Sequence, residues 1–253
     1  MSGLLKADFY RLFRSKFFYI LGGVVLLLSL AVFALFALIV EFGGEIGGAM
    51  TAGALQRLSF DGTVGYCAAI AAAVFVCSDF SGGGIRDKVA RGCGRGKVFF
   101  SLWIALSFAV LVYYLLTQFV VFALGGAAFG WEGVRAAEAV SLFVAGVGIS
   151  LANAAIFCAL SVLLKKISSA LLVGILLLFG VSLLQGVLAV AEIYIGKEAF
   201  SVFCDVFAYL TPAGQTSLLA SGGNGWIAAA ASCGWLLLVG LGVPPLFAWQ
   251  DLK

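Results

Sequence analysis

The chain has 253 residues, of which 63% are hydrophobic and 11% are charged; its net charge is +3 and its mean hydropathy is +1.16. A soluble globular domain has roughly 45–50% apolar and about 25% charged residues. This chain is therefore too apolar to cover itself with a polar surface. The composition excludes a soluble globular domain and predicts a protein that is solvated in part by lipid.

The residue types also limit the chemistry. The chain has six cysteines and no histidine, so the commonest metal ligand and neutral-pH proton shuttle is missing. It has no C-x-x-C pair, and a Ser–His catalytic pair is impossible. We therefore expect no metal site, no disulfide framework, no cofactor and no catalytic residues, and hence a protein that is not an enzyme by itself.

Six apolar runs predict an all-α, polytopic membrane protein with six transmembrane helices in one domain, residues 1–253. A span needs about 20 apolar residues, and its backbone must be satisfied internally, which favours helices. The second run is short and alanine-rich, and it is long enough only if Thr63 and its neighbours contribute. The first is too long for a cleaved signal peptide. The predicted spans are residues 17–40, 62–77, 99–124, 140–164, 170–191 and 226–248.

Lysine and arginine residues near the span ends predict the orientation, because cytoplasmic loops are enriched in them. Alternate segments hold twelve of the fifteen basic residues, and the other segments hold three basic residues and most of the acids. The first set is Lys6, Arg11, Arg14, Lys16, Arg86, Lys88, Arg91, Arg95, Lys97, Lys165, Lys166 and Lys253, and the second is Arg57, Arg135 and Lys197. The alternation predicts six spans in the cell membrane with both termini in the cytoplasm.

Residues 4–14 read LLKADFYRLFR. Their apolar side chains separate from the charged ones, which include Asp8 and Arg11, at helical spacing. This pattern predicts an N-terminal elbow helix that lies on the inner leaflet before the first span. The alternative is a basic flank that only anchors the topology.

The longest predicted cytoplasmic connection covers residues 78–98, SDFSGGGIRDKVARGCGRGKV. Three glycines at 82–84 break the chain, residues 85–91 favour a short helix, and the glycines of 92–96 form a second break. The alternative is a solvated loop that only sets orientation. The length and the glycine–helix–glycine pattern favour a docking element.

The glycine-rich part of this connection is not a phosphate-binding loop. Such a loop needs the pattern G-x-x-x-x-G-K-[ST], but Arg91 stands at the first glycine position and Val98 follows Lys97. We therefore expect this chain to have no ATP site.

The predicted outer segment between the last two spans, residues 192–225, mixes aromatic, apolar and charged residues. It favours one or two short helices at the outer interface, and a simple amphipathic loop is the alternative. Within the spans the notable polar side chains are neutral amides: Gln118, Asn153 and Gln185. Such amides join helices by hydrogen bonds or line a pathway.

The arrangement resembles the integral-membrane permease subunits of ABC transporters of the type-2 exporter class, which include exporters for drugs, antibiotic peptides and bacteriocin self-immunity. The likeness covers the whole chain as a layout and short stretches as motifs. The motif positions are Lys6, Asp8, Arg11, Arg14, Ser15 and Lys16, then Asp79-Phe80-Ser81, Gly84-Ile85-Arg86, residues 92–97 and Asp251-Leu252-Lys253.

The resemblance implies a mechanism in which a separate ATPase subunit binds under the inner face and a second permease chain encloses the pathway. It implies no nucleic-acid partner. The residues implied in ATPase docking are Asp8, Arg11, Asp79, Phe80, Ile85, Arg86, Asp87, Lys88 and Arg91. Those implied in the pathway are Gln118, Asn153 and Gln185.

Two other classes fit the sequence. A secondary transporter or channel would work without an ATPase, but the spans hold no central ionisable group for coupling and show no inverted repeat. A membrane scaffold that transports nothing is the other alternative. The sequence does not identify the substrate, the ATPase or the second chain.

Overall fold

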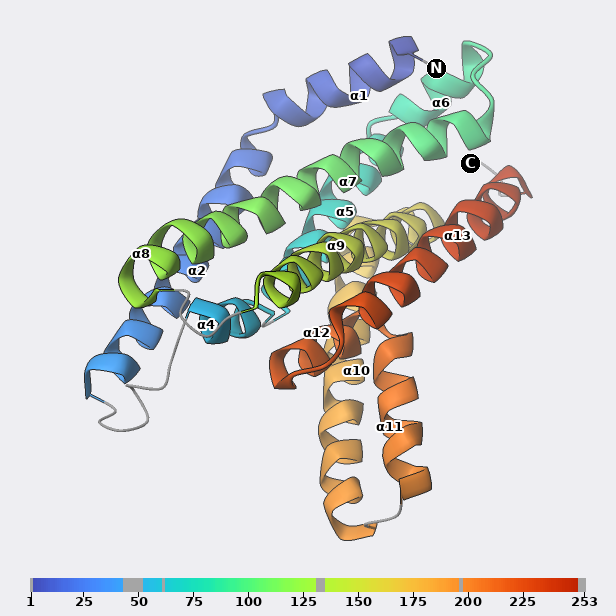
Figure 1. Cartoon of the computed structure of the whole chain (residues 1–253). Coiled ribbons are helices and arrows are strands. Elements are labelled where there is room, and N and C mark those ends of the chain that lie inside the picture. Colours follow the sequence, from blue (N-terminus) through green and yellow to red (C-terminus); the bar gives the residue numbers. More distant parts are fainter. Residues whose placement is uncertain (1, 43–51, 61, 131–134, 196–197, 250–253) are drawn as a thin grey trace.

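The computed structural model describes residues 2–42, 52–60, 62–130, 135–195 and 198–249 (Figure 1). Over these ranges the chain is helical and contains no strand, and six helices are long and apolar enough to cross a membrane. The helices are α1 (Ser2–Arg14), α2 (Lys16–Phe42), α4 (Ala52–Leu58), α5 (Thr63–Ser81), α6 (Gly84–Ala90), α7 (Arg95–Phe119), the π-helix η1 (Val120–Gly125), α8 (Gly126–Phe129), α9 (Ala136–Leu164), α10 (Ile167–Ile195), α11 (Glu198–Leu210), α12 (Pro212–Ser221) and α13 (Gly225–Trp249).

The prediction of six spans is therefore confirmed, and each predicted range falls on one long helix or helical run. The second span does recruit Thr63, where α5 begins, and continues to Ser81. The third continues through η1 and α8 to Phe129. Residues 251–253, which carry the last part of the family resemblance, lie outside the described residues.

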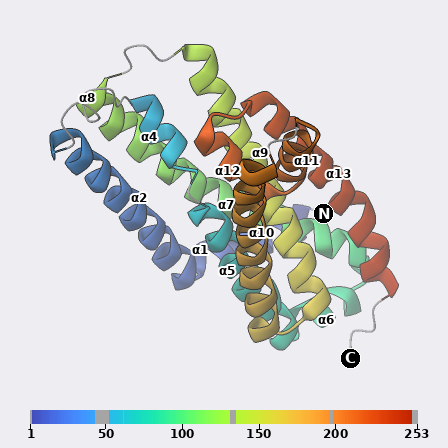
Figure 2. The same ribbon diagram turned by 90° about the horizontal axis from the view of Figure 1, so that it is seen from below.

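The interior of the bundle is formed by α5, α7 and α9. Figure 2 shows them between α2 at one edge and α13 at the other. In the span that includes α5, 65% of the most apolar stretch is buried, against 11% in α2. The alanines of α5 explain its position, because small side chains let helix backbones approach closely. The run that looked shortest in the sequence is thus the central helix.

A close approach also joins α7 to α9. A Cβ atom at Gly146 would lie 2.2 Å from the hydroxyl oxygen of Tyr114, so only glycine fits there. The same hydroxyl donates a hydrogen bond to the carbonyl oxygen of Phe143 at 3.1 Å. The two helices therefore meet in a contact that is fixed in both shape and hydrogen bonding.

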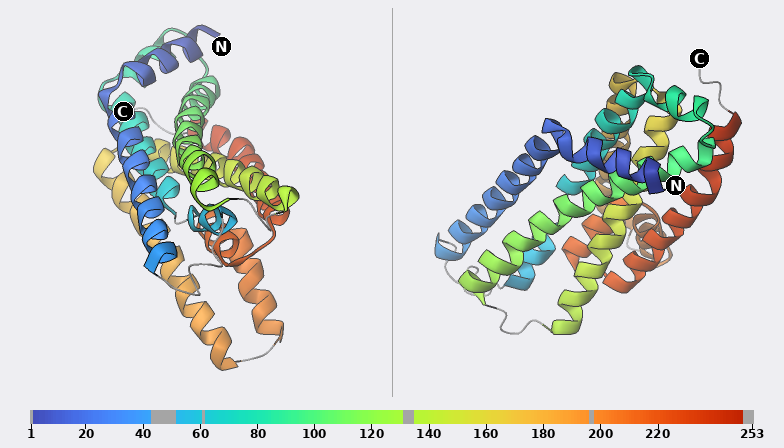
Figure 3. Two further views of the ribbon diagram at one scale, coloured as in Figure 1. Left: turned by 60° about the vertical axis from the view of Figure 1, so that its left-hand side comes forward. Right: turned by 90° about the horizontal axis from the view of Figure 1, so that it is seen from above.

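The elbow helix is present as α1, which meets α2 in a bend at Ser15 and lies across one end of the bundle (Figure 3). Leu12 is buried in the core, and the ring of Phe9 packs edge-on against Phe108 of α7. The predicted division of faces is wrong in one respect. Asp8 does not lie on an exposed charged face, because it is buried with Leu12 on the protein side.

The segment between the last two spans forms two short helices, as favoured by the sequence, rather than a simple loop. In Figure 1, α11 runs back antiparallel to α10, and the pair projects away from the other helices. Thr211 caps the next helix, α12, since its side chain accepts a hydrogen bond from the backbone N–H of Gly214 at 3.3 Å.

Candidate functional site

Four charged side chains from three helices contact one another at the end of the bundle where α1 and α6 lie. We call them the charge cluster. They are Asp8, Arg11, Asp79 and Lys88.

Lys88 of α6 connects the two carboxylates of the charge cluster. Its Nζ donates to Asp8 Oδ1 at 2.6 Å and to Asp79 Oδ2 at 2.8 Å. Arg11 forms an ion pair with Asp79 Oδ1, and its guanidinium lies 4.2 Å from the ring centre of Phe75. Ser101 at the start of α7 donates to Asp8 Oδ2 at 2.6 Å. The cluster therefore joins α1, α5, α6 and α7.

Burial makes these contacts obligatory. Asp8 is 1% exposed and Asp79 is 7% exposed, and a charge removed from water is very costly unless it is paired. Burial lowers the pKa of Arg11, against the opposing effect of Asp8. It also lowers the pKa of Lys88, against the hydrogen bond to Asp8. The cluster balances two positive and two negative charges in a site shielded from water.

Glycines place the cluster where α5 turns into α6. Gly83 has a φ of +74°, a left-handed conformation that side chains disfavour. At the next residue, a Cβ atom on Gly84 would lie 2.6 Å from Asp79 Oδ1. The glycine run that the sequence marked as a break therefore also allows the carboxylate to sit against the backbone of α6.

The residues that the resemblance implied in ATPase docking are brought together, but they divide into two groups. Asp8, Asp79 and Ile85 are buried inside the protein, and Phe80 packs edge-on against Phe247 of α13. Arg11 and Lys88 are half-buried. The exposed members all lie on α6 and at its end; they are Arg86, Asp87 and Arg91.

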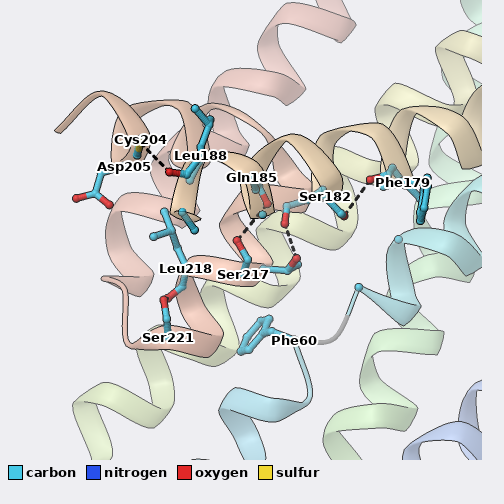
Figure 4. A pocket seen from close by; sticks show the side chains of 18 of the residues that line it. Phe60, Phe179, Ser182, Gln185, Leu188, Cys204, Asp205, Ser217, Leu218 and Ser221 are labelled. Carbon is cyan, nitrogen blue, oxygen red and sulfur yellow. Dashed lines mark hydrogen bonds between the residues drawn. The ribbon is translucent and has the colours of Figure 1, made fainter. Parts of the chain in front are cut away.

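A cavity of about 820 Å³ lies at the other end of α5 (Figure 4). It is lined by the start of α5, the second half of α10, and both short helices α11 and α12. Two of the three amides implied in a pathway, Asn153 and Gln185, line it. The third, Gln118, does not. It is buried elsewhere, and its Nε2 donates to Ser59 Oγ at 3.3 Å.

The two amides of the cavity differ in their partners. Gln185 donates to Thr211 Oγ1 at 3.2 Å and accepts from Ser217 Oγ at 3.2 Å. Asn153 is 4% exposed and has no hydrogen-bond partner within the described part of the chain. Because Asn153 lines the cavity, its amide offers two donors and an acceptor to whatever fills it.

The cavity also has two carboxylates, Glu192 of α10 and Asp205 of α11. Among the residues that the structure describes, neither forms an ion pair, and no lysine or arginine lines the cavity. Sequence reasoning missed these two residues as site residues. Both belong to the acid-rich segments, but only the antiparallel packing of α10 and α11 brings them to the same cavity.

Within the described ranges, no group of three or more cysteine, aspartate and glutamate side chains is placed to hold a metal ion. No protein-family model matches the chain, and neither does any curated protein. The family resemblance therefore depends on the motif residues alone, and the charge cluster and the cavity are the structural features that bear on function.

Proposed function

We propose that the chain is the membrane-spanning permease subunit of an ATP-driven exporter similar to the type-2 ABC class. It resides in the cell membrane with both termini in the cytoplasm. A separate ATPase subunit supplies the energy, and a second permease chain, identical or different, completes the substrate pathway. The chain itself performs no chemical step.

The observation that carries the proposal is the attachment of α6. This short helix presents Arg86, Asp87 and Arg91 outward while Lys88 holds it to Asp8 and Asp79. A loop that only set the orientation would need no such buried attachment. A helix that transmits movement from a partner to the spans does need such an attachment, because an unattached loop would move without displacing the spans.

The path of the force supports the same function. Asp79 lies in the last turn of α5, and Gly65 near its start lines the cavity. At 1.5 Å per residue these positions are about 21 Å apart on one rigid helix. A displacement of α6 is therefore delivered through α5 to the cavity wall, so two states of the docking surface become two states of the cavity.

The test is to co-express the tagged chain with the ATPase encoded nearest to it and to purify both in mild detergent. We expect co-elution and vanadate-sensitive ATP hydrolysis. The double substitution Arg86→Glu with Arg91→Glu should abolish both, because charge-assisted contacts at a docking surface are reversed in sign. The buried cluster is untouched, so the variant should keep the wild-type thermal unfolding midpoint.

The matched control reverses the same charge elsewhere, with Arg135→Glu and Lys166→Glu. Both residues are exposed and neither belongs to α6, so the control should retain co-elution. An ATPase that never binds the wild-type chain, together with transport that proceeds without it, would overturn the proposal in favour of a secondary transporter. Equal loss in both double variants would remove α6 as the docking surface.

A further inference from the structure

The lining of the cavity changes in character along α10. Leu178, Gln185 and Glu192 all line it, and at 1.5 Å per residue the first and last are about 21 Å apart. The cavity is therefore elongated, with an apolar end, an amide in the middle and a carboxylate at the far end. Its volume, about 820 Å³, is within the range of about 300–1,000 Å³ that holds small molecules.

The far end favours positive charge. Glu192 and Asp205 approach the cavity from two facing helices, and no lysine or arginine among the described lining residues compensates them. Figure 4 shows Asp205 beside Cys204 and Leu188 at this end. Anionic ligands are disfavoured there by like-charge repulsion, whereas an ammonium or guanidinium group gains charge-assisted hydrogen bonds.

The opposite end favours an apolar body that also carries a hydrogen-bonding group. Leu178 and Phe179 supply apolar walls. Asn153 is only 4% exposed, lines this end of the cavity and has no hydrogen-bond partner in the described structure. Its Nδ2 would be 3.5 Å from a Cβ atom at Gly65. This unpartnered amide is an observation independent of the two carboxylates, and it too indicates a ligand.

We propose that the cavity binds an elongated amphipathic cation, with its amine or guanidinium group between Glu192 and Asp205 and its apolar chain toward Leu178. A hydroxyl or carbonyl group along that chain pairs with Asn153. That this ligand is the exported substrate rests on the proposed function; that it binds here does not.

The experiment uses the full chain in phosphatidylcholine nanodiscs, without ATPase or ATP. One probe is a long-chain alkylamine with a photoreactive diazirine on its chain, and the other is its N-acetyl analogue, which is neutral. After photolysis, labelled peptides are quantified by mass spectrometry. Labelling of residues 178–192 and 204–218 is divided by labelling of the α2 residues 24–39, which reports partition into lipid.

We expect the amine to give a ratio about three- to tenfold higher than the neutral analogue, as expected for one or two partly exposed charge pairs. Glu192→Gln with Asp205→Asn should reduce the amine ratio to that of the neutral probe. The matched control removes an exposed carboxylate elsewhere, with Glu41→Gln, and should leave the ratio unchanged. A third probe carries a hydroxyl group on the chain of the same alkylamine. Asn153→Ala should lower the ratio for this probe, but not for the plain alkylamine.

Equal ratios for the amine and its neutral analogue would overturn the proposal, and so would an amine ratio that survives the cavity double variant. These outcomes are separate from the test of the permease. An ATPase complex without amine labelling would leave the permease in place and reject the ligand class. Amine labelling without any ATPase partner would keep the binding site and reject the exporter.

Discussion

The charge cluster and the cavity are both polar sites in an apolar chain, and they treat their polar groups in opposite ways. In the cluster each charged side chain has an ion-pair partner: Arg11 pairs with Asp79, and Lys88 pairs with Asp8 and Asp79. In the cavity, the buried amide of Asn153 has no hydrogen-bond partner, and the half-buried Glu192 and the exposed Asp205 have no ion-pair partner, within the described residues. A buried polar group that is paired holds structure together, whereas an unpaired one is available to a ligand.

This difference assigns distinct roles to the two ends of α5. Substitutions in the cluster should damage folding, and substitutions of the unpaired groups in the cavity should damage binding alone. Thermal unfolding in detergent separates the two effects, because it needs neither ligand nor ATPase. The following variants test the contrast in order of expected size.

The largest effect is expected for Asp79→Asn. The change leaves Arg11 and Lys88 with a single carboxylate between them, and an uncompensated buried charge costs about 3–5 kcal/mol of unfolding free energy. The thermal midpoint should fall clearly, whereas Asp205→Asn in the cavity should leave it unchanged. Adding Arg11→Gln to Asp79→Asn should recover part of the loss, since the pair is coupled. Equal midpoints for Asp79→Asn and Asp205→Asn would contradict the contrast.

A smaller loss is expected for Gly84→Ala. The new methyl group would be 2.6 Å from Asp79 Oδ1, so the carboxylate must move away from Arg11, at a cost of about 1–3 kcal/mol. The control is Gly94→Ala, where nothing lies within 4 Å of the added carbon and φ is −59°. Its midpoint should stay near the wild-type value, and matching losses in both variants would show that the loss at Gly84 does not depend on its contact with Asp79.

We expect the stability cost of losing an amide to depend on its hydrogen-bond partners and not on its position near the cavity. Gln215 lies on α12 near the cavity; it donates to the carbonyl oxygen of Tyr209 at 2.7 Å and accepts from Ser232 Oγ at 2.7 Å. Gln215→Ala strands both partners and should cost about 1–3 kcal/mol. Asn153→Ala removes an amide without partners and should cost less. A larger loss for Asn153→Ala would mean that this amide is paired after all.

The smallest effect on stability is expected for Glu192→Gln, which should leave the thermal midpoint unchanged while it lowers amine labelling of the cavity. The reason is that its carboxylate has no ion pair to lose within the described structure. Unfolding and labelling should be measured on the same preparation. A fall in the midpoint would place Glu192 among the structural charges.

Hydropathy and periodicity were sufficient to predict the six spans, the elbow helix and the short helix within residues 78–98. These features depend on local sequence, because about 20 apolar residues form a span wherever they occur. The same reasoning misjudged the face of α1. Asp8 looks like a surface charge until Lys88 and Ser101, 80 and 93 residues away in sequence, are brought against it.

The amides show where sequence reasoning stops. Gln118, Asn153 and Gln185 are all neutral amides within predicted spans, but Gln118 donates a hydrogen bond to Ser59 while the other two line the cavity. The packing of the helices decides which amide lines the cavity. Six apolar runs of similar hydropathy do not show which helices pack against each other. The burial of the alanine-rich α5 was equally hidden, because hydropathy favours helices that face lipid over those that pack together.

The length of α2 links lipid to the charge cluster. Its uncharged stretch, residues 17–40, extends about 36 Å, more than the roughly 30 Å of bilayer hydrocarbon. A helix with such hydrophobic mismatch tilts or deforms the bilayer around it. Since α2 turns into α1 at Ser15, and α1 carries Asp8 and Arg11, a change of bilayer thickness bears on the ion pairs that hold α6. A change of membrane thickness is therefore expected to alter the geometry of the charge cluster.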